Sequence, residues 1–357
     1  MHIEYLDVVV GAQYGSEGKG HITAQLVKKA YHANHKVINV RVAGPNAGHT
    51  VIDLKGTAYP LRTIPVGAAI SSEIYLYLAP GSEIEIPVLL DEWNRLHDGG
   101  HHIERLYISP EVTLLEDEHK QTENDEALTE KIGSTGKGIG AARAARLLRK
   151  ARRLQDAPEI IQQLQDLGIQ TAHPWEIYTG KAHVIIEGTQ GYGLGLHAGH
   201  YPQCTSSDTR AIDFLAMAAV NPWHIKRDNF KIWAVARVYP IRVAGNSGKL
   251  ENETTWEELG LPPEKTTVTQ KIRRVGKWDE QLIRNAIRDN GGAPTVRIAL
   301  TMVDQLIPEI AGLNNENIDT YHLDHKWKMQ KFIGQVESES GALVEAITTS
   351  PKDIYWR

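Results

Sequence analysis

The residues best suited to chemistry form a glycine-rich stretch, GAQYGSEGKG at residues 11–20, between an apolar run and a helical pattern. Backbone N–H groups in such a turn converge on an anion, and a following helix N-terminus adds about half a positive charge. Lys19 adds a mobile ammonium. The stretch is not a strict Walker motif, because Gln13 stands where that motif has its first glycine. We predict a phosphate-binding loop here, and the alternative is a turn with a solvated lysine.

Two further glycine-rich stretches carry polar side chains that could act on the same ligand. GPNAGHT, at residues 44–50, contains His49, and an ordinary histidine has the near-neutral pKa that suits donation to a phosphoryl or carbonyl oxygen. IGSTGKGIG, at residues 132–140, resembles a monophosphate cradle. It precedes Arg143, Arg146 and Arg149, whose spacing predicts one face of a helix. Parallel strands end at the same sheet edge, so we expect these loops to face one another.

Downstream segments offer groups that could read a base or hold a carboxylate. Gln190 follows an apolar run, and its amide donates and accepts in one plane, as reading a purine edge requires. The segment TTVTQKIRRVG, at residues 266–276, concentrates hydroxyls and cations that suit a carboxylate or a phosphate. Asp304 also follows an apolar run, and it could accept two N–H bonds from guanine or cap a helix.

Short apolar runs that alternate with helical patterns must position these loops. The runs predict strands at residues 7–10, 36–42, 74–78, 106–108, 183–186, 232–236 and 296–300. Apolar spacing of three and four predicts helices over 21–31, 159–167 and 278–288. Asp156 and Asp279 are candidate N-caps for the second and third of these helices.

This alternation predicts an α/β fold that is P-loop-like, with a mostly parallel central sheet, helices on both faces and loop insertions. We find no linker or repeat, so we expect a single domain over residues 1–357. The segment 243–277 is rich in glycine and proline, with a brief helical pattern around 256–259. Such a segment inside an enzyme is typical of a mobile substrate loop.

Composition limits the classes of partner. The 357 residues contain 39 basic and 44 acidic side chains, a formal net charge of −5, so no overall basic field favours nucleic acid. The single cysteine, Cys204, cannot form an internal disulfide, and the first residues lack the pattern of a signal peptide. No apolar run approaches the roughly 20 residues that cross a bilayer. We therefore expect a cytoplasmic protein that binds neither nucleic acid nor membranes.

These motifs, in this order, resemble the adenylosuccinate synthetase family along nearly the whole chain. Members of that family couple the 6-oxo position of a purine nucleotide to aspartate at the expense of a nucleoside triphosphate. Their first loop typically reads Gly-Asp-Glu-Gly-Lys-Gly, but this chain has Ser16 in place of the aspartate, which is the family's base and a metal ligand. Glu17, a bound water and the incoming aspartate are the candidates that would then take the proton from N1 of the base.

The serine makes the chain most similar to the bacteriophage branch of the family, the 2-aminoadenylosuccinate synthases. These act on dGMP and serve the synthesis of 2-aminoadenine DNA. Guanine carries an amine at C2, where the base of IMP carries only hydrogen. A hydroxyl is shorter than a carboxylate, so it relieves crowding there and can hydrogen-bond the amine. A site built around that amine leaves a partner unsatisfied when the amine is absent, which favours dGMP.

The resemblance also implies a role for each matching position. The donor triphosphate is assigned to Gly15, Glu17, Gly18, Lys19, Gly20, Gly48, Thr50, Arg273, Asp304, Ser350 and Pro351. The nucleotide dGMP is assigned to Ser16, Asn46, Ser134, Thr135, Arg149, Gln190 and Thr205, and aspartate to Thr267, Val268, Thr269, Lys271 and Arg273. Catalysis is assigned to Ser16, Lys19, His49 and Gln190, and Mg²⁺ to Ser16 and the Gly48 carbonyl. Arg149 matches an arginine that reaches the neighbouring subunit's substrate phosphate, which implies a homodimer.

Two departures from the family pattern concern the donor. The family's Thr-Lys-Leu-Asp, which reads guanine in GTP, is here Thr301-Met302-Val303-Asp304, and its Ser-Thr-Gly-Pro is Thr348-Thr349-Ser350-Pro351. Both changes weaken the case for GTP and favour ATP or dATP. One alternative is an ordinary adenylosuccinate synthetase that acts on IMP with GTP. Another is a nucleotide-dependent switch that hydrolyses nothing.

Overall fold

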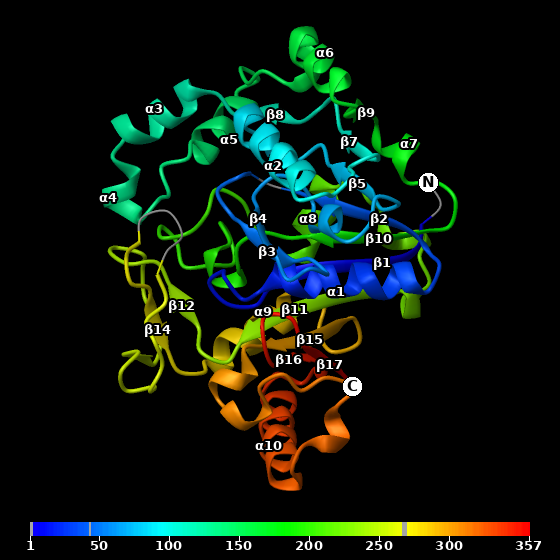
Figure 1. Ribbon diagram of the computed structural model, residues 1–357. Coiled ribbons are helices and arrows are strands. Elements are labelled where there is room, and N and C mark those ends of the chain that lie inside the picture. Colours follow the sequence, from blue (N-terminus) through cyan, green and yellow to red (C-terminus); the bar gives the residue numbers. More distant parts are fainter. Residues whose placement is uncertain (1–2, 43, 266–269) are drawn as a thin grey trace.

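The structure is a computed structural model that describes residues 3–42, 44–265 and 270–357. Its centre is a ten-stranded sheet in the order β17-β16-β15-β11-β1-β10-β2-β5-β7-β9 (Figure 1). Neighbouring strands in it are parallel, except that β17 runs antiparallel to β16 at one edge. The predicted α/β fold with a mostly parallel sheet is confirmed.

The strands of this sheet are mostly apolar. They are β1 (Ile3–Gly11), β2 (Lys36–Arg41), β5 (Tyr75–Leu78), β7 (Leu106–Ile108), β9 (Gln170–Thr171), β10 (Ala182–Glu187), β11 (Phe230–Arg237), β15 (Val296–Thr301), β16 (Leu343–Thr348) and β17 (Ile354–Trp356). Small sheets outside it contain β3 (His49–Ile52), β4 (Ala58–Leu61), β6 (Glu83–Ile84), β8 (Thr113–Leu114), β12 (Ile241–Arg242), β13 (Glu253–Thr254) and β14 (Arg274–Gly276).

The α-helices of the described residues flank the sheet or extend from it. They are α1 (Lys19–His32), α2 (Ile86–Asp98), α3 (Asp117–Asp125), α4 (Leu128–Ile132), α5 (Ile139–Leu147), α6 (Pro158–Asp166), α7 (Pro174–Ile177), α8 (Ala211–Met217), α9 (Glu280–Asp289) and α10 (Leu323–Ser340). In the described parts of the chain, none of them is both long and apolar enough to cross a membrane.

Alternating side chains of β1 separate two hydrophobic cores, one on each face of the sheet. Val8 and Val10 belong to a core shared with α8, α9 and α10, whereas Val9 belongs to a core shared with α1, α2 and α6. All three valines are fully buried. Helices therefore cover both faces (Figure 1), as a parallel sheet requires, and leave the strand ends free to carry loops.

The predicted strands are all present, as β1, β2, β5, β7, β10, β11 and β15, and the predicted helices are α1, α6 and α9. Asp279 caps α9, because its side chain accepts a bond from Leu282 N (3.0 Å). The prediction for Asp156 is wrong. Ala157 is the N-cap of α6, and the Asp156 carboxylate instead bonds the backbone and guanidinium of Arg153.

The segment around 243–277 is more regular than predicted. β13 and β14 lie within it and form a small antiparallel sheet with β12, which directly precedes it. The helical pattern around 256–259 is a turn. Trp256 is buried there, and its indole N–H donates to the Arg273 carbonyl (2.8 Å). The apolar side chains of this stretch thus pack on the small sheet instead of forming a helix.

Candidate active site

The first loop (residues 11–20) and the second loop (residues 44–50) follow strands of the same central group. β1 and β2 both pair in parallel with β10, so their carboxyl ends lie at one edge. A methyl group added to Gly20 would lie only 2.8 Å from Cβ of His49. The prediction that these two loops meet is therefore confirmed.

The first loop is shaped by its own carboxylate. Glu17 is fully buried, and its Oε1 accepts bonds from the backbone N–H groups of Gln13 (3.2 Å) and Gly15 (2.7 Å). Its Oε2 lies 2.7 Å from Lys19 Nζ. Gly18 is the N-cap of α1 with φ of 87°, a conformation that glycine adopts without strain. Glu17 thus fixes the loop and the lysine, and its inward position gives no geometric support to a role as proton acceptor.

Ser16 occupies an exposed position in the first loop. Its backbone is left-handed, with φ of 58°, and its Oγ accepts a bond from Arg273 Nη1 (3.1 Å). Its carbonyl oxygen lies 3.5 Å from Arg237 Nη1. Gln13, which breaks the Walker pattern, ties the loop to β11, because its Nε2 donates to Arg237 O (2.9 Å) and its Oε1 accepts from Arg237 N (3.0 Å). Ser16 is therefore held between two guanidinium groups.

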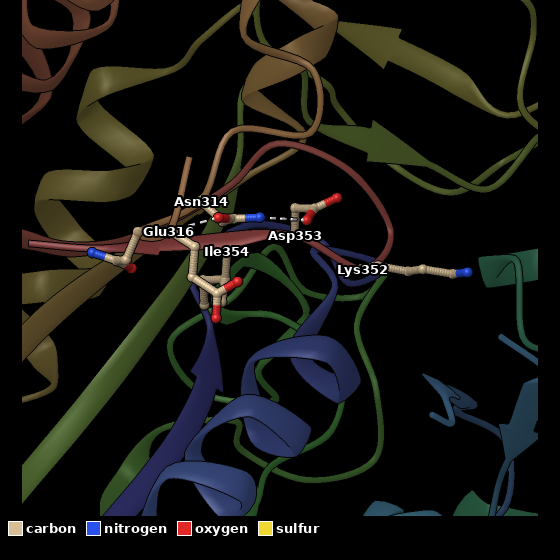
Figure 2. A pocket seen from close by; sticks show the side chains of 6 residues that line it. Asn314, Glu316, Lys352, Asp353 and Ile354 are labelled. Carbon is tan, nitrogen blue, oxygen red and sulfur yellow. Dashed lines mark hydrogen bonds between the residues drawn. The ribbon is translucent and has the colours of Figure 1, made fainter. Parts of the chain in front are cut away.

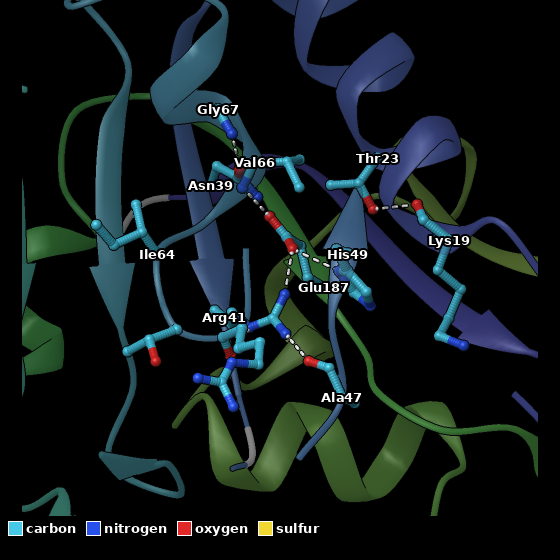
Figure 3. A network of polar contacts seen from close by, with 12 residues as sticks. Lys19, Thr23, Asn39, Arg41, Ala47, His49, Ile64, Val66, Gly67 and Glu187 are labelled. Carbon is cyan, nitrogen blue, oxygen red and sulfur yellow. Dashed lines mark hydrogen bonds and ion pairs between the residues drawn. The ribbon is translucent and has the colours of Figure 1, made fainter. Parts of the chain in front are cut away.

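His49 opens β3 and belongs to a buried polar network (Figure 3). Its Nδ1 lies 2.8 Å from Glu187 Oε2, which Arg41 Nη1 also contacts at 3.0 Å. The other oxygen of Glu187 accepts a bond from Val66 N (2.8 Å), and Arg41 Nη2 donates to Ala47 O (2.6 Å). Glu187 and Arg41 are residues to which our sequence analysis gave no role. Glu187 could have been noticed in the sequence, because it is a carboxylate at the end of the otherwise mostly apolar strand β10.

These contacts determine the protonation of His49. A carboxylate beside Nδ1 places the ring hydrogen on that nitrogen, so Nε2 of the neutral ring carries a lone pair. Nε2 is buried and has no hydrogen-bond partner among the described residues. Burial, together with Arg41 and Lys19, lowers the pKa of His49 to about 4, although Glu187 opposes this shift. The ring is therefore neutral near pH 7, with one unpaired nitrogen where the two loops meet.

The third loop (residues 132–140) leads into α5, as predicted, but a carboxylate already occupies the start of that helix. Glu123 of α3 is buried, and its two oxygens accept bonds from Gly138 N and Gly140 N, each at 2.9 Å. Its Oε2 also lies 3.4 Å from Ser134 Oγ. The helix N-terminus thus donates to a carboxylate of the protein itself, and the role of this turn as a monophosphate cradle stays a prediction. Thr135 is exposed beside it.

The arginines after the third loop do not share one helical face, because α5 ends before Arg149. Arg143 forms two bonds with Glu83, at 2.7 and 3.1 Å, and Arg146 lies 3.2 Å from Glu111. Arg149 has a left-handed backbone, with φ of 61°, and is exposed. The first two arginines are therefore held in ion pairs with the protein's own carboxylates, and Arg149 is exposed at the surface.

Gln190 lies close to the first loop, and Thr205 is bonded to Leu194, which lies close to the same loop. A methyl group added to Gly15 would lie 3.8 Å from Gln190 Oε1 and 3.8 Å from a side-chain carbon of Leu194. Thr205 N donates to Leu194 O (2.8 Å). Gln190 thus neighbours the residue before Ser16, and Thr205 is connected to the same place through Leu194.

Three of the residues expected to bind the donor, Asp304, Ser350 and Pro351, follow β15 and β16. Thr301 Oγ1 donates to Glu17 O (2.6 Å), which joins the end of β15 to the first loop. Asp304 lies in a short 3₁₀ helix, and burial raises its pKa. Ser350 Oγ donates to Asp353 Oδ2 (2.6 Å) in the turn before β17. An open polar pocket of about 250 Å³ adjoins that turn (Figure 2), lined by Asn314, Asn315, Glu316, Lys352, Asp353 and Ile354.

The residues expected to bind aspartate are only partly described. Thr267, Val268 and Thr269 lie outside the described residues. Lys271 is exposed, and the side chain of Arg273 reaches the first loop through its bond to Ser16 Oγ.

The expected metal ligands are neutral oxygens. Among the described residues, no group of three or more His, Cys, Asp or Glu side chains could hold a metal ion. Ser16 and Gly48 are both exposed on their loops, and Asn46 and Thr50 lie beside Gly48. Mg²⁺ usually takes few protein ligands and completes its octahedron with substrate phosphates and waters. A hydroxyl and a carbonyl therefore fit a magnesium ion that binds together with phosphates, and not one that the protein holds alone.

Comparisons with known proteins agree over most of the chain. The sequence profile of adenylosuccinate synthetase matches residues 8–173 and 157–312. The adenylosuccinate synthetase of Methanococcus maripaludis (strain C5) is 36% identical over 349 residues, which cover 97% of this chain and 96% of that protein. The adenylosuccinate synthetase of Methanocaldococcus jannaschii is 35% identical over 349 residues, which cover 97% of this chain and 94% of that protein.

Two solved structures share the fold. One is the succinoaminodeoxyadenylate synthetase of cyanophage S-2L bound to dGMP and to dATP as an energy donor. It has a TM-score of 0.78 and 25% identity, and the match covers 99% of this chain and 96% of that one. The other is the fully ligated adenylosuccinate synthetase of Plasmodium falciparum, with a TM-score of 0.73 and 21% identity, covering 98% and 99%.

Proposed function

Because this chain belongs to the adenylosuccinate synthetase family of carbon–nitrogen ligases, we propose that it couples L-aspartate to the 6-position of dGMP. A nucleoside triphosphate is hydrolysed to the diphosphate and phosphate in the same reaction. The product is N6-succino-2-amino-2′-deoxyadenylate, which would serve the synthesis of 2-aminoadenine DNA. The γ-phosphoryl group passes to O6 of the base, and the aspartate amine then attacks C6 and expels phosphate.

The observation that carries this proposal is the hydroxyl of Ser16. Ser16 is exposed on the first loop, its Oγ accepts a bond from Arg273 Nη1 (3.1 Å), and Gln190 lies beside the neighbouring Gly15. A carboxylate at this position would extend further from the loop and carry a charge. The shorter hydroxyl leaves room for the 2-amino group of guanine and offers it a hydrogen-bond acceptor. The solved structure of the cyanophage S-2L synthetase, which is bound to dGMP, supports the same choice of nucleotide.

His49, Lys19 and the first-loop backbone would act by positioning and by stabilising developing charge. His49 is neutral in the structure, so it donates to the phosphorylated oxygen only after it gains a proton at Nε2. An approaching phosphoryl group adds negative charge beside Nε2 and raises the pKa of His49 toward that state. Glu187 keeps the other nitrogen bonded throughout, so Nε2 points in one direction.

We propose ATP or dATP as the donor. Met302 and Ser350 replace the lysine and the glycine that accompany guanine in the family pattern, and the cyanophage S-2L structure contains dATP as an energy donor. Mg²⁺ bound with the triphosphate would neutralise phosphate charge, and Ser16 and Gly48 would supply oxygens to it. The exposed guanidinium of Arg149 is available to a second copy of the chain, which supports a homodimer.

The alternative is an ordinary adenylosuccinate synthetase that acts on IMP with GTP. It is favoured by the sequence relatives, because the methanogen enzymes at 35% and 36% identity are named adenylosuccinate synthetases. Asp304, which matches the guanine-reading aspartate of the family pattern, is also retained.

A substrate panel tests these proposals. The purified chain is assayed for phosphate release with dGMP, GMP, IMP or AMP, each with and without aspartate, and each with ATP, dATP or GTP. We expect the highest kcat/KM for dGMP with ATP or dATP, and release that requires aspartate. A higher kcat/KM for IMP than for dGMP would overturn the proposal. Phosphate release that does not depend on aspartate would indicate a hydrolase or a nucleotide switch.

A further inference from the structure

A partly buried ion pair connects the segment after β13 to the end of β11. Arg237, the last residue of β11, is fully buried, and its Nη1 donates to Glu264 Oε2 at 3.1 Å. Its Nη2 donates to the other oxygen of Glu264, so the guanidinium and the carboxylate form a two-bond pair. Burial raises the pKa of Glu264, but the bonds with Arg237 outweigh it and hold that pKa below its usual range. Glu264 is therefore a charged anchor near neutral pH.

The backbone of Glu264 is in turn paired with the residues that precede β14. Arg273 N donates to Glu264 O (2.8 Å), and Lys265 and Ile272 form an antiparallel bridge. The side chain of Arg273 then reaches the first loop, where Nη1 donates to Ser16 Oγ. Glu264 thus connects to Ser16 by two routes, since Arg237 contacts the Ser16 carbonyl and Arg273 contacts its hydroxyl.

We infer that Glu264 is a positioning residue: its ion pair with Arg237 fixes Arg273 against Ser16 and thereby controls binding of the amino-acid substrate. The inference rests on the proposed function in one respect, because it takes Arg273 to contact the carboxylate of aspartate. The Arg237 guanidinium bonds the Glu264 carboxylate and the Ser16 carbonyl, and the Arg273 guanidinium bonds the Ser16 hydroxyl. The Arg273 guanidinium is therefore oriented before an anion binds at Ser16, and preorganisation of this kind increases the affinity for that anion.

The structure offers a matched control on the same small sheet. Glu253 of β13 pairs with Arg274, with bonds of 2.7 and 2.6 Å, but its described contacts do not include the first loop. A change at Glu253 therefore removes a similar ion pair from the same segment and leaves Arg237, Arg273 and Ser16 in place.

The experiment compares Glu264→Gln, Glu264→Asp and Glu253→Gln with the unchanged chain. KM values for aspartate and for the nucleotide are measured with dGMP, and also with IMP, so that the comparison is made with whichever nucleotide the enzyme uses. We expect Glu264→Gln to raise the KM for aspartate about tenfold or more, with little change in the nucleotide KM, because Arg273 loses its fixed direction. Glu264→Asp keeps the charge and should recover part of the effect, and Glu253→Gln should have none.

A double-variant measurement shows whether Glu264 acts through Arg273. In an Arg273→Ala background, Glu264→Gln should raise the aspartate KM by less than twofold further, because the group that it positions is already gone. Amide hydrogen exchange adds a readout that needs no turnover. Exchange in the first loop should be faster in Glu264→Gln and unchanged in Glu253→Gln. If Glu264→Gln leaves the aspartate KM unchanged, or if its effect multiplies fully with that of Arg273→Ala, the inference is overturned.

A failure of dGMP as substrate would be seen in the unchanged chain, before any variant is compared. The two proposals can therefore fail separately. Should Glu264→Gln not fold because Arg237 becomes an unpaired buried charge, Glu264→Asp alone decides the question. A normal aspartate KM and normal first-loop exchange in that folded variant would then overturn the inference.

Discussion

The side chain at position 16 separates the two candidate substrates. The left-handed backbone of Ser16, with φ of 58°, is one that Asp and Asn tolerate better than most residues, so both can be tested there. We expect Ser16→Asp to lower kcat/KM for dGMP by roughly a hundredfold relative to IMP, because the carboxylate crowds the 2-amino group. Ser16→Asn has the same shape without the charge and distinguishes crowding from electrostatics. Undiminished use of dGMP by Ser16→Asp would contradict the role of the hydroxyl.

His49 is a second residue whose role can be isolated. In His49→Asn, the amide nitrogen can keep the bond to Glu187, but no atom replaces Nε2. Loss of one preorganised donor costs about 2–4 kcal/mol at the transition state, so kcat should fall by roughly 30- to 1,000-fold. The thermal unfolding midpoint should change little, since the network with Glu187 and Arg41 persists. Full activity of folded His49→Asn would refute the assignment. His49→Gln, whose side chain is one methylene longer than that of Asn, is the matched comparison.

At the scale of elements, buried carboxylates shape the loops that leave the sheet. Glu17 bonds the backbone of the first loop, Glu187 fixes the start of β3 through His49, and Glu123 bonds the start of α5. Glu17 and Glu123 accept bonds that glycine-rich backbone would otherwise donate to water, and Glu187 accepts bonds from His49, Arg41 and Val66 N, so these loops have a defined shape before a ligand arrives.

The start of α5 gives a prediction at this scale. Glu123→Gln removes the charge and leaves one good acceptor for the N–H groups of Gly138 and Gly140. We expect the free energy of unfolding, measured with denaturant, to fall by about 1–2 kcal/mol. The KM for dGMP should rise several-fold, while the KM for aspartate stays constant. Glu118→Gln, on an exposed face of the same helix, is the control and should behave like the unchanged chain. Equal nucleotide KM values in both variants would contradict a role for this turn in nucleotide binding.

For the molecule as a whole, stability should depend on pH through histidines that are held neutral. Burial, with Lys28, lowers the pKa of His21 to about 4, and burial, with His183, lowers that of His35. In the unfolded chain both have a pKa of about 6.5, so the unfolded state binds more protons below that pH. Through His21, the free energy of unfolding should therefore fall as pH decreases from about 6.5 toward 4, by up to about 1.4 kcal/mol per pH unit, and His35 should contribute a fall in the same direction below about pH 6.5.

Urea unfolding at several pH values between 7.5 and 4.5 checks this dependence. His21→Gln should flatten the curve, because Gln cannot take the proton. Asp213 and Asp304 act in the opposite sense at the acidic end, since burial raises their pKa values and their folded forms bind protons more readily. Stability that increases steadily from pH 7 to pH 5 would show that the histidines do not dominate.

The sequence alone determined the elements and the order of the loops. Short continuous apolar runs, and apolar spacing of three and four, are local properties, so β1, β10 and α9 could be predicted without knowledge of their neighbours. The glycines of the first loop likewise indicated a turn before a helix. The strands β16 and β17 were not predicted, because Leu343 and Glu345 face outward or are half-buried at that edge and the apolar pattern is correspondingly weak.

Tertiary structure decided which groups are free to act. Glu187 and His49 are 138 positions apart in the chain, and their bond exists because β10 and β2 are neighbours in the sheet. Arg237 and Glu264 meet because β12 and β13 both pair with β14, which brings the segment that contains Glu264 back to the end of β11. Periodicity and loop composition carry no information about such partners, since burial of a charge is decided by what lies opposite it. The sequence could therefore indicate a nucleotide site. Only the tertiary structure showed that Glu17 and Glu123 already accept hydrogen bonds from the backbone, and that Nε2 of His49 has no partner among the described residues.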